Sequence, residues 1–71
     1  MLTDAEIEIY YWQNDRAGSF TTKLIETICK ADLLNQAKLS LGFPDLVEAV
    51  QRFQNERGYW ESIQERMGNK W

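Results

Sequence analysis

The sequence predicts an all-α protein: one small bundle of four to five short helices with tight Gly/Pro corners. Apolar residues recur at helical spacing through most of the chain. Residues that start and stop helices separate these apolar segments. The length of 71 residues suits a single domain with one core, spanning 1–71. The expected helices span about 4–14, 20–31, 33–41, 44–57 and 59–67.

The first helix is predicted from a capping box. In Thr3-Asp4-Ala5-Glu6, the Thr3 hydroxyl and the Glu6 carboxylate can each bond the other residue's backbone N–H. A strand is the alternative, because apolar and polar side chains alternate at Ile7, Ile9 and Tyr11. No other segment alternates clearly enough to pair with such a strand, so the pattern favours a helix over 4–14.

The second and third helices each show one apolar stripe. Ser19 is a suitable N-cap for the second helix. Asp32 can cap a third helix, or the second helix bends there and continues. The residues expected to face the core are Phe20, Leu24 and Ile28 in the second helix, and Leu33 or Leu34, Ala37 and Leu41 in the third.

A helix-to-helix corner is predicted at Gly42-Phe43-Pro44. Glycine tolerates the left-handed backbone that closes many helices, and proline is acceptable only in the first turn of the next one. Phe43 is expected to turn inward between the two helices. An acidic residue at Asp45 suits the start of the helix that follows.

The last two helices are predicted from clear apolar faces. Glu48 and Arg52, four residues apart, are expected to pair on the outer side of the fourth helix, and Gly58 to end it. The inward faces comprise Leu46, Val47, Val50 and Phe53 in the fourth helix, and Tyr59, Trp60, Ile63 and Met67 in the fifth.

Charge and composition restrict the partners and the compartment. Eleven acidic and eight basic residues give a net charge of −3, which disfavours binding to nucleic acid or to an anionic membrane. No apolar run approaches the ~20 residues of a membrane span. The acidic N-terminus has no signal-peptide pattern, and the single cysteine, Cys29, suits a reducing compartment. We therefore expect a cytoplasmic protein.

The groups that most enzymes need are missing from the sequence. There is no histidine, no glycine-rich phosphate loop and no calcium-loop pattern. Glu61 and Glu65 would share a helix face, where two solvated carboxylates are the simpler interpretation. Cys29 lies beside an apolar stripe and is interpreted as a buried structural thiol. The sequence thus predicts no enzyme, no cofactor and no metal site.

A helix-turn-helix motif is the alternative interpretation of the corner at Gly42. The second helix of such a motif presents donors to bases and phosphates in its first turn. Here that turn carries Asp45 and Glu48, and the next basic residue is Arg52. This arrangement disfavours DNA recognition.

Aromatic residues are the strongest sign of a function. The chain has three each of Trp, Tyr and Phe, which is a large number for so small a core. One interpretation places Trp12, Phe53 and either Tyr59 or Trp60 in the core, with the other rings half-covering it. In the other, some rings anchor a partner protein or a second copy of the chain. The candidate contact residues are Tyr10, Tyr11, Trp60 and Trp71.

Three stretches carry a resemblance to a known type of protein: Phe20–Ile25 with Lys30–Asp32, Lys38–Pro44, and Gly58–Trp60. Over about Phe20 to Trp60 the chain resembles small proteins found in tailed phages and prophages of bacteria. The resemblance implies a phage or mobile-element origin and action in the bacterial cytoplasm. It brings no catalytic or ligand-binding residue with it.

Together, the residues and the resemblance predict a non-enzymatic protein–protein interaction module. Such a module would bind a larger bacterial or phage protein, such as a host defence component, and inhibit or redirect it. The alternatives are a small helix-turn-helix-like accessory protein that binds nucleic acid, and a self-assembling structural subunit.

Overall fold

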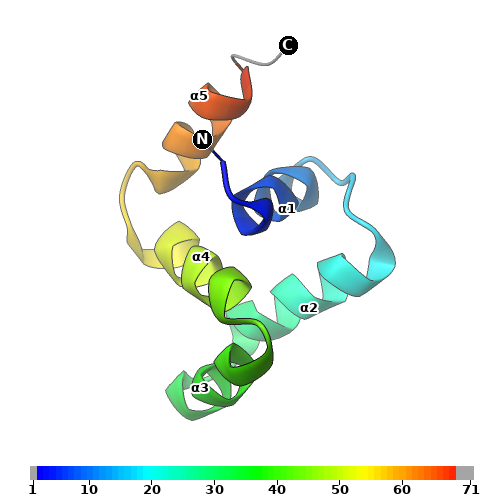
Figure 1. Cartoon of the computed structure of the whole chain (residues 1–71), viewed down its shortest axis with the longest axis vertical. Helices are drawn as coiled ribbons and strands as arrows, with labels where there is room; N and C mark the ends of the chain where they lie inside the picture. Colours follow the sequence, from blue (N-terminus) through cyan, green and yellow to red (C-terminus); the bar gives the residue numbers. More distant parts are fainter. Residues whose placement is uncertain (1, 69–71) are drawn as a thin grey trace.

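The computed structural model describes residues 2–68. These residues form five α-helices and no strand (Figure 1). The helices are α1 (Asp4–Gln13), α2 (Ser19–Lys30), α3 (Leu33–Gly42), α4 (Pro44–Asn55) and α5 (Tyr59–Gly68). The all-α prediction is confirmed, and the strand alternative for the first segment is wrong.

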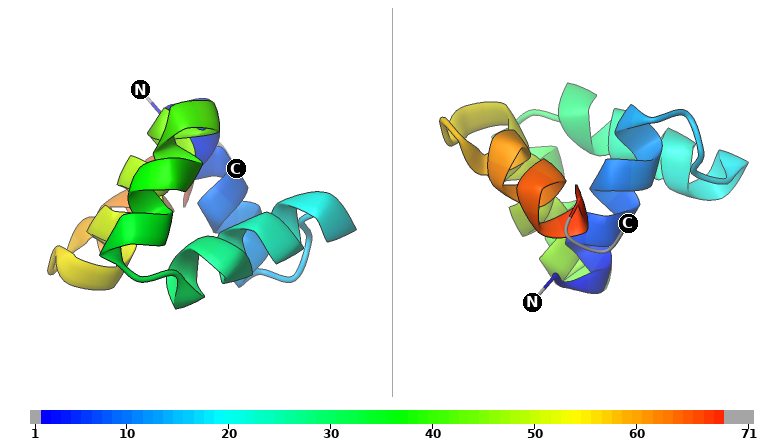
Figure 2. Two further views of the ribbon diagram at one scale, coloured as in Figure 1. Left: turned by 90° about the horizontal axis from the view of Figure 1, so that it is seen from below. Right: turned by 90° about the horizontal axis from the view of Figure 1, so that it is seen from above.

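Helix α4 is the centre of the fold, because it packs against each of the other four helices. Helices α3 and α5 lie at opposite ends of the molecule (Figure 1), so α3 is in front in the view from below and α5 in the view from above (Figure 2). The buried apolar residues are Ala5, Ile9, Ile25, Ile28, Leu46, Val47, Ala49, Val50, Tyr59, Ile63 and Met67. Helix α3 contributes none of them.

The capping box at the start of α1 forms as predicted. The Thr3 hydroxyl accepts a hydrogen bond from the Glu6 backbone N–H at 3.1 Å, and the Glu6 carboxylate accepts one from the Thr3 N–H at 3.0 Å. At the other end, Asp15 adopts a left-handed backbone with φ 57°. The chain therefore leaves α1 abruptly and turns toward α2.

Helices α2 and α3 are separate, and one of the two predicted caps is correct. Gly18, not Ser19, is the N-cap of α2, and its carbonyl accepts from the Thr22 N–H at 2.9 Å. Helix α2 ends before Ala31, whose backbone is extended. The Asp32 carboxylate then caps α3 by accepting from the Asn35 N–H at 2.8 Å.

The corner between α3 and α4 is as tight as predicted, but its conformation differs. Gly42 is the last residue of α3 and has no positive φ; in residues 2–68, Gly58 at φ 87° is the glycine that does. Phe43 forms the corner itself, with φ −134° and ψ 59°. The prediction that Phe43 turns inward is wrong: it is 39% exposed.

The apolar stripe predicted for α3 faces solvent rather than the core. Leu33, Leu34 and Leu41 are 83%, 66% and 87% exposed, and Ala37 is exposed beside them. The inward side of α3 carries Leu39, which is half-buried against the core, and Gln36, which is buried. Its amide donates to the carbonyls of Ile28 (3.2 Å) and Ala31 (3.3 Å) and accepts from the Gln51 amide (2.9 Å). These bonds tie α3 to the end of α2 and to α4.

Candidate functional site

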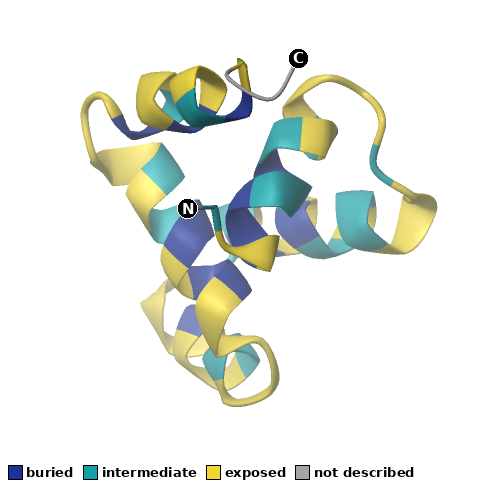
Figure 3. Ribbon diagram, turned by 45° about the horizontal axis from the view of Figure 1, so that its top comes forward, coloured by how far each residue is buried: buried dark blue, intermediate teal, exposed yellow. Residues whose placement is uncertain are grey.

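Apart from Tyr11, the exposed large apolar side chains of the described residues belong to the segment from the start of α2 to the corner before α4. We call Leu33, Leu34, Ala37 and Leu41 the α3 stripe. These residues lie within about 100° of one another around the helix axis, because successive residues are ~100° apart. Most residues of α3 are accordingly exposed, while its inward side carries the buried Gln36 (Figure 3). An amphipathic helix thus presents its apolar side to solvent.

An apolar groove begins one residue beyond the stripe, at Gly42. Its space of about 360 Å³ lies between α1, the start of α2 and the start of α4. Leu24 and Leu46 line it, and the rings of Phe20 and Phe43 lie beside it with centroids 6.5 Å apart. Phe20, which was predicted to face the core, is 69% exposed. The two rings bring the start of α2 next to the corner before α4, and both rings remain exposed.

Carboxylates are the charged groups of this groove. Asp4, Glu8 and Asp45 line it, and no lysine or arginine of residues 2–68 does. None of the three has an ion-pair partner in the described part of the chain. Asp4 and Asp45 lie in the first turns of α1 and α4, where the helix dipole favours an acidic side chain. Glu8 lies beyond the first turn of α1, so the dipole does not account for it.

Three of the four aromatic residues predicted as contacts are brought together. Tyr11, Tyr10, Trp60, Phe53 and Trp12 form an aromatic row in which successive ring centroids are 6.1, 6.0, 5.8 and 5.6 Å apart. Tyr10, Trp60, Phe53 and Trp12 are half-buried against the core, and Tyr11 is exposed. The row joins α1, α4 and α5. Trp71 lies outside the described residues.

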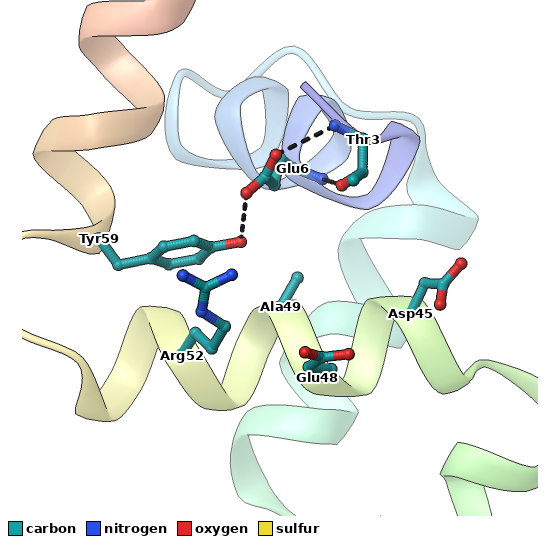
Figure 4. A pocket seen from close by; sticks show the side chains of 7 residues that line it. All are labelled: Thr3, Glu6, Asp45, Glu48, Ala49, Arg52 and Tyr59. Carbon is teal, nitrogen blue, oxygen red and sulfur yellow. Dashed lines mark hydrogen bonds between the residues drawn. The ribbon is translucent and has the colours of Figure 1, made fainter. Parts of the chain in front are cut away.

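A buried polar network connects α1 to α5. The Glu6 carboxylate accepts four hydrogen bonds: from the Thr3 N–H, from the Tyr59 hydroxyl at 2.8 Å, and from two Arg66 nitrogens at 3.1 Å. Figure 4 shows the Tyr59 hydroxyl pointing at this carboxylate, below the capping box. Both Glu6 and Tyr59 are buried.

The network shifts two pKa values in opposite directions. Burial alone would raise the pKa of Glu6, but the bonds from Arg66, Thr3 and Tyr59 outweigh it and lower this pKa to about 2. Burial and the bond to Glu6 raise the pKa of Tyr59 to about 12. At neutral pH Glu6 is therefore charged and Tyr59 neutral, and neither is poised to exchange a proton.

Arg52 lies against the same network from α4. Its guanidinium carbon is 4.1 Å from the centroid of the Tyr59 ring (Figure 4), a cation–π arrangement. Its ion-pair partner is Glu56, with Nε and Oε1 2.8 Å apart, rather than the predicted Glu48. A shallow pocket of about 100 Å³ lies above these side chains. Three carboxylates line it: that of Glu6, which already accepts four hydrogen bonds, and those of Asp45 and Glu48, which are exposed.

The remaining polar candidates are Cys29 and the pair Glu61 and Glu65. Cys29 is half-buried, and burial, followed by the nearby charge of Glu26, raises its pKa. Glu61 and Glu65 are both exposed on α5. No three His, Cys, Asp or Glu side chains within residues 2–68 are grouped as metal ligands. No helix in that range is long and apolar enough to cross a membrane.

Sequence reasoning missed the groove and the polar network because both depend on the tertiary arrangement. Glu6 and Tyr59, which the network joins, are 53 residues apart in sequence. One signal for the α3 stripe was present: α3 carries apolar residues on two sides, at Leu39 and at Leu41, and a helix packed on one neighbour can bury only one of them.

Comparison with family models, curated protein sequences and solved structures gave no match for this chain.

Proposed function

We propose that this chain is a non-enzymatic protein-binding module of phage or mobile-element origin, acting in the bacterial cytoplasm. Its partner is a larger host or phage protein, which it inhibits or redirects by occupying part of its surface. The observation that carries the proposal is the α3 stripe, an apolar helix face turned toward solvent.

The stripe is costly for a protein that works alone. Three exposed leucines on a helix of 10 residues leave apolar area in water, at about 25 cal/mol per Å² relative to burial. The same area contributes to binding when a partner covers it. Contiguous apolar patches of this kind mark interaction sites more often than scattered single residues do.

Helix α3 is also free to receive a partner. It packs on α4 and makes no comparable contact with α1 or α5 in the described part of the chain. Its inward side is held by the hydrogen bonds of Gln36 and by Leu39, which packs against the core. The helix is therefore positioned by the fold while its apolar side remains available. The resemblance to small phage proteins supports a partner in the host or in the phage.

The proposal is tested by affinity capture with two matched variants. In the first variant, Leu33→Lys with Leu41→Lys places charge on the stripe. In the second, Asn35→Lys with Gln64→Lys adds the same charge at two exposed positions that lie outside the stripe. Circular dichroism and thermal unfolding check that both variants stay folded.

A bacterial protein retained by the wild type and by the second variant, but lost by the first, supports the proposal. Sedimentation of the purified wild type identifies self-association. If the wild type is a dimer and the first variant is a monomer, the stripe binds a second copy of the chain instead of a different protein. A monomer that retains no specific protein overturns the proposal.

A further inference from the structure

The groove beside Phe20 and Phe43 differs from the α3 stripe in carrying charge of one sign. Three carboxylates lie at an apolar space of about 360 Å³, which is near the lower end of the range of ligand pockets (roughly 300–1,000 Å³). Such a space receives apolar side chains that project from a segment lying on the surface, rather than a whole helix. A segment in that position would pass directly over Asp4, Glu8 and Asp45.

The carboxylates make the groove selective. They lie on α1 and α4, two of the helices that line the groove, and have no cationic partner in residues 2–68. An apolar segment flanked by acidic residues would be repelled there, whereas one flanked by lysine or arginine would be attracted. Complementary charge of this kind raises association rates and excludes wrong partners.

Two exposed phenylalanines supply the apolar contact. Phe20 comes from the start of α2 and Phe43 from the corner before α4, and their rings are tilted by 53°. Large aromatic side chains at the centre of an interface supply much of its binding free energy. The groove also begins where the α3 stripe ends, since Leu41 precedes Gly42. One extended partner segment could cover both.

We infer that the groove binds a basic amphipathic segment of the partner protein, with a large apolar side chain against the rings of Phe20 and Phe43 and lysine or arginine residues over Asp4, Glu8 and Asp45. This inference rests on the proposed function and specifies the chemistry of the partner. It also specifies that binding weakens as salt rises, because the charge pairs are solvent-exposed.

The test uses two synthetic helical peptides labelled with fluorescein. Both have leucine at positions i, i+3, i+4 and i+7. One has lysine at its polar positions and the other has glutamate. Fluorescence anisotropy measures their affinity for the wild-type protein at low and at high salt. The lysine peptide is expected to bind, more weakly at high salt, and the glutamate peptide is not.

Matched variants separate the groove from general attraction to an acidic protein. Glu8→Gln with Asp45→Asn removes two charges at the groove, and Glu61→Gln with Glu65→Gln removes two charges on α5. Each pair includes one carboxylate in the first turn of a helix. The groove variant should bind the lysine peptide about fivefold more weakly, and the α5 variant should bind like the wild type.

A second matched pair tests the apolar contact. Phe20→Ala should weaken binding of the lysine peptide about tenfold. Tyr11→Ala removes an exposed aromatic ring outside the groove and should leave binding unchanged. Both positions are exposed, so unfolding is not expected to complicate the comparison, and circular dichroism checks this.

The outcomes distinguish this inference from the proposed function. Equal losses in the groove and α5 charge variants, or equal binding of the two peptides, overturn the inference. If neither peptide binds while a captured partner depends on Leu33 and Leu41, the inference fails and the protein-binding proposal stands. If neither peptide binds and no partner is captured, both fail.

Discussion

The Tyr59 hydroxyl donates a 2.8 Å hydrogen bond to the Glu6 carboxylate, joining the first turn of α1 to the first residue of α5. The same carboxylate completes the capping box of α1 and accepts two bonds from Arg66. One side chain thus starts a helix and holds two helices together. The bond from Tyr59 is fully buried, whereas those from Thr3 and Arg66 are only partly buried.

Replacing either partner of this bond should lower stability. Tyr59→Phe removes the hydroxyl and should cost about 1–2 kcal/mol, as expected for a buried hydrogen bond to a charged group. Glu6→Gln removes the charge that Arg66 and Tyr59 both bind and should cost about 2–3 kcal/mol. Urea unfolding followed by circular dichroism measures both free energies.

The matched control for the hydroxyl is Tyr10→Phe. Tyr10 is half-buried, and its hydroxyl makes no hydrogen bond to the described residues. A change within about 0.5 kcal/mol is therefore expected. If Tyr10→Phe and Tyr59→Phe cost the same, the bond to Glu6 does not stabilise the fold.

Stability should fall at both extremes of pH. The pKa of Glu6 is lowered from 4.5 to about 2 on folding, so its contribution is complete above about pH 4.5 and is lost as pH falls toward 2. That shift corresponds to a loss on the order of 3 kcal/mol. The pKa of Tyr59 is raised to about 12, so its contribution is complete below pH 10 and is lost as pH rises through 12.

The Glu6→Gln variant isolates the acid limb of this dependence. Other carboxylates also respond to acid, Glu56 among them, because its bond from Arg52 lowers its pKa. The difference between wild type and variant removes their contribution. Unfolding free energies measured from about pH 6 to 2 should converge as pH falls. Parallel curves would show that the pKa of Glu6 is not lowered in the folded state.

Gln36 should contribute to the stability of the fold, although most of its neighbours in α3 are exposed. Gln36→Met keeps the length of the side chain but loses the bonds to Ile28, Ala31 and Gln51. The expected cost is about 1–3 kcal/mol, because two of these partners are carbonyls at the end of α2. The unfolding free energy measures it.

Gln54→Met is the control for this change. Gln54 is exposed and makes one long bond, 3.4 Å, to the Cys29 carbonyl. Its replacement should cost less than about 0.5 kcal/mol. Equal costs for the two variants would mean that Gln36 does not fix the orientation of α3.

Local signals in the sequence were sufficient to predict the helices but not the orientation of every helix. The capping box at Thr3, the cap at Asp32 and the corner at Pro44 act through neighbouring residues, so their effects can be read from the chain. Which side of α3 faces inward depends instead on Gln36 reaching α2 and α4 and on Leu39 packing against the core. An apolar stripe therefore indicates a helix, but it does not by itself show that the stripe is buried in the core of the same chain.

In the candidate site, too, local signals could be predicted from the sequence and the tertiary arrangement could not. Tyr10, Tyr11 and Trp60 were predicted as contacts because a helix cannot bury consecutive aromatic residues, and the structure places them in one aromatic row. Most of that row is packed against the core. The groove at Phe20 and Phe43 could not be predicted, because it is formed by three helices whose packing is tertiary.

Phe43 lies at a corner that the sequence predicted correctly, but its exposure was predicted wrongly. Its replacement by alanine tests that exposure directly. A buried phenylalanine costs about 3–5 kcal/mol when replaced by alanine. Because Phe43 is 39% exposed and its ring contacts Phe20, itself exposed, Phe43→Ala should cost less than about 1 kcal/mol. Leu46→Ala, three residues further along and buried, should cost about 2–5 kcal/mol. Urea unfolding of both variants compares them under one condition. If Phe43→Ala costs as much as Leu46→Ala, the corner residue belongs to the core, and its ring is not available to a partner.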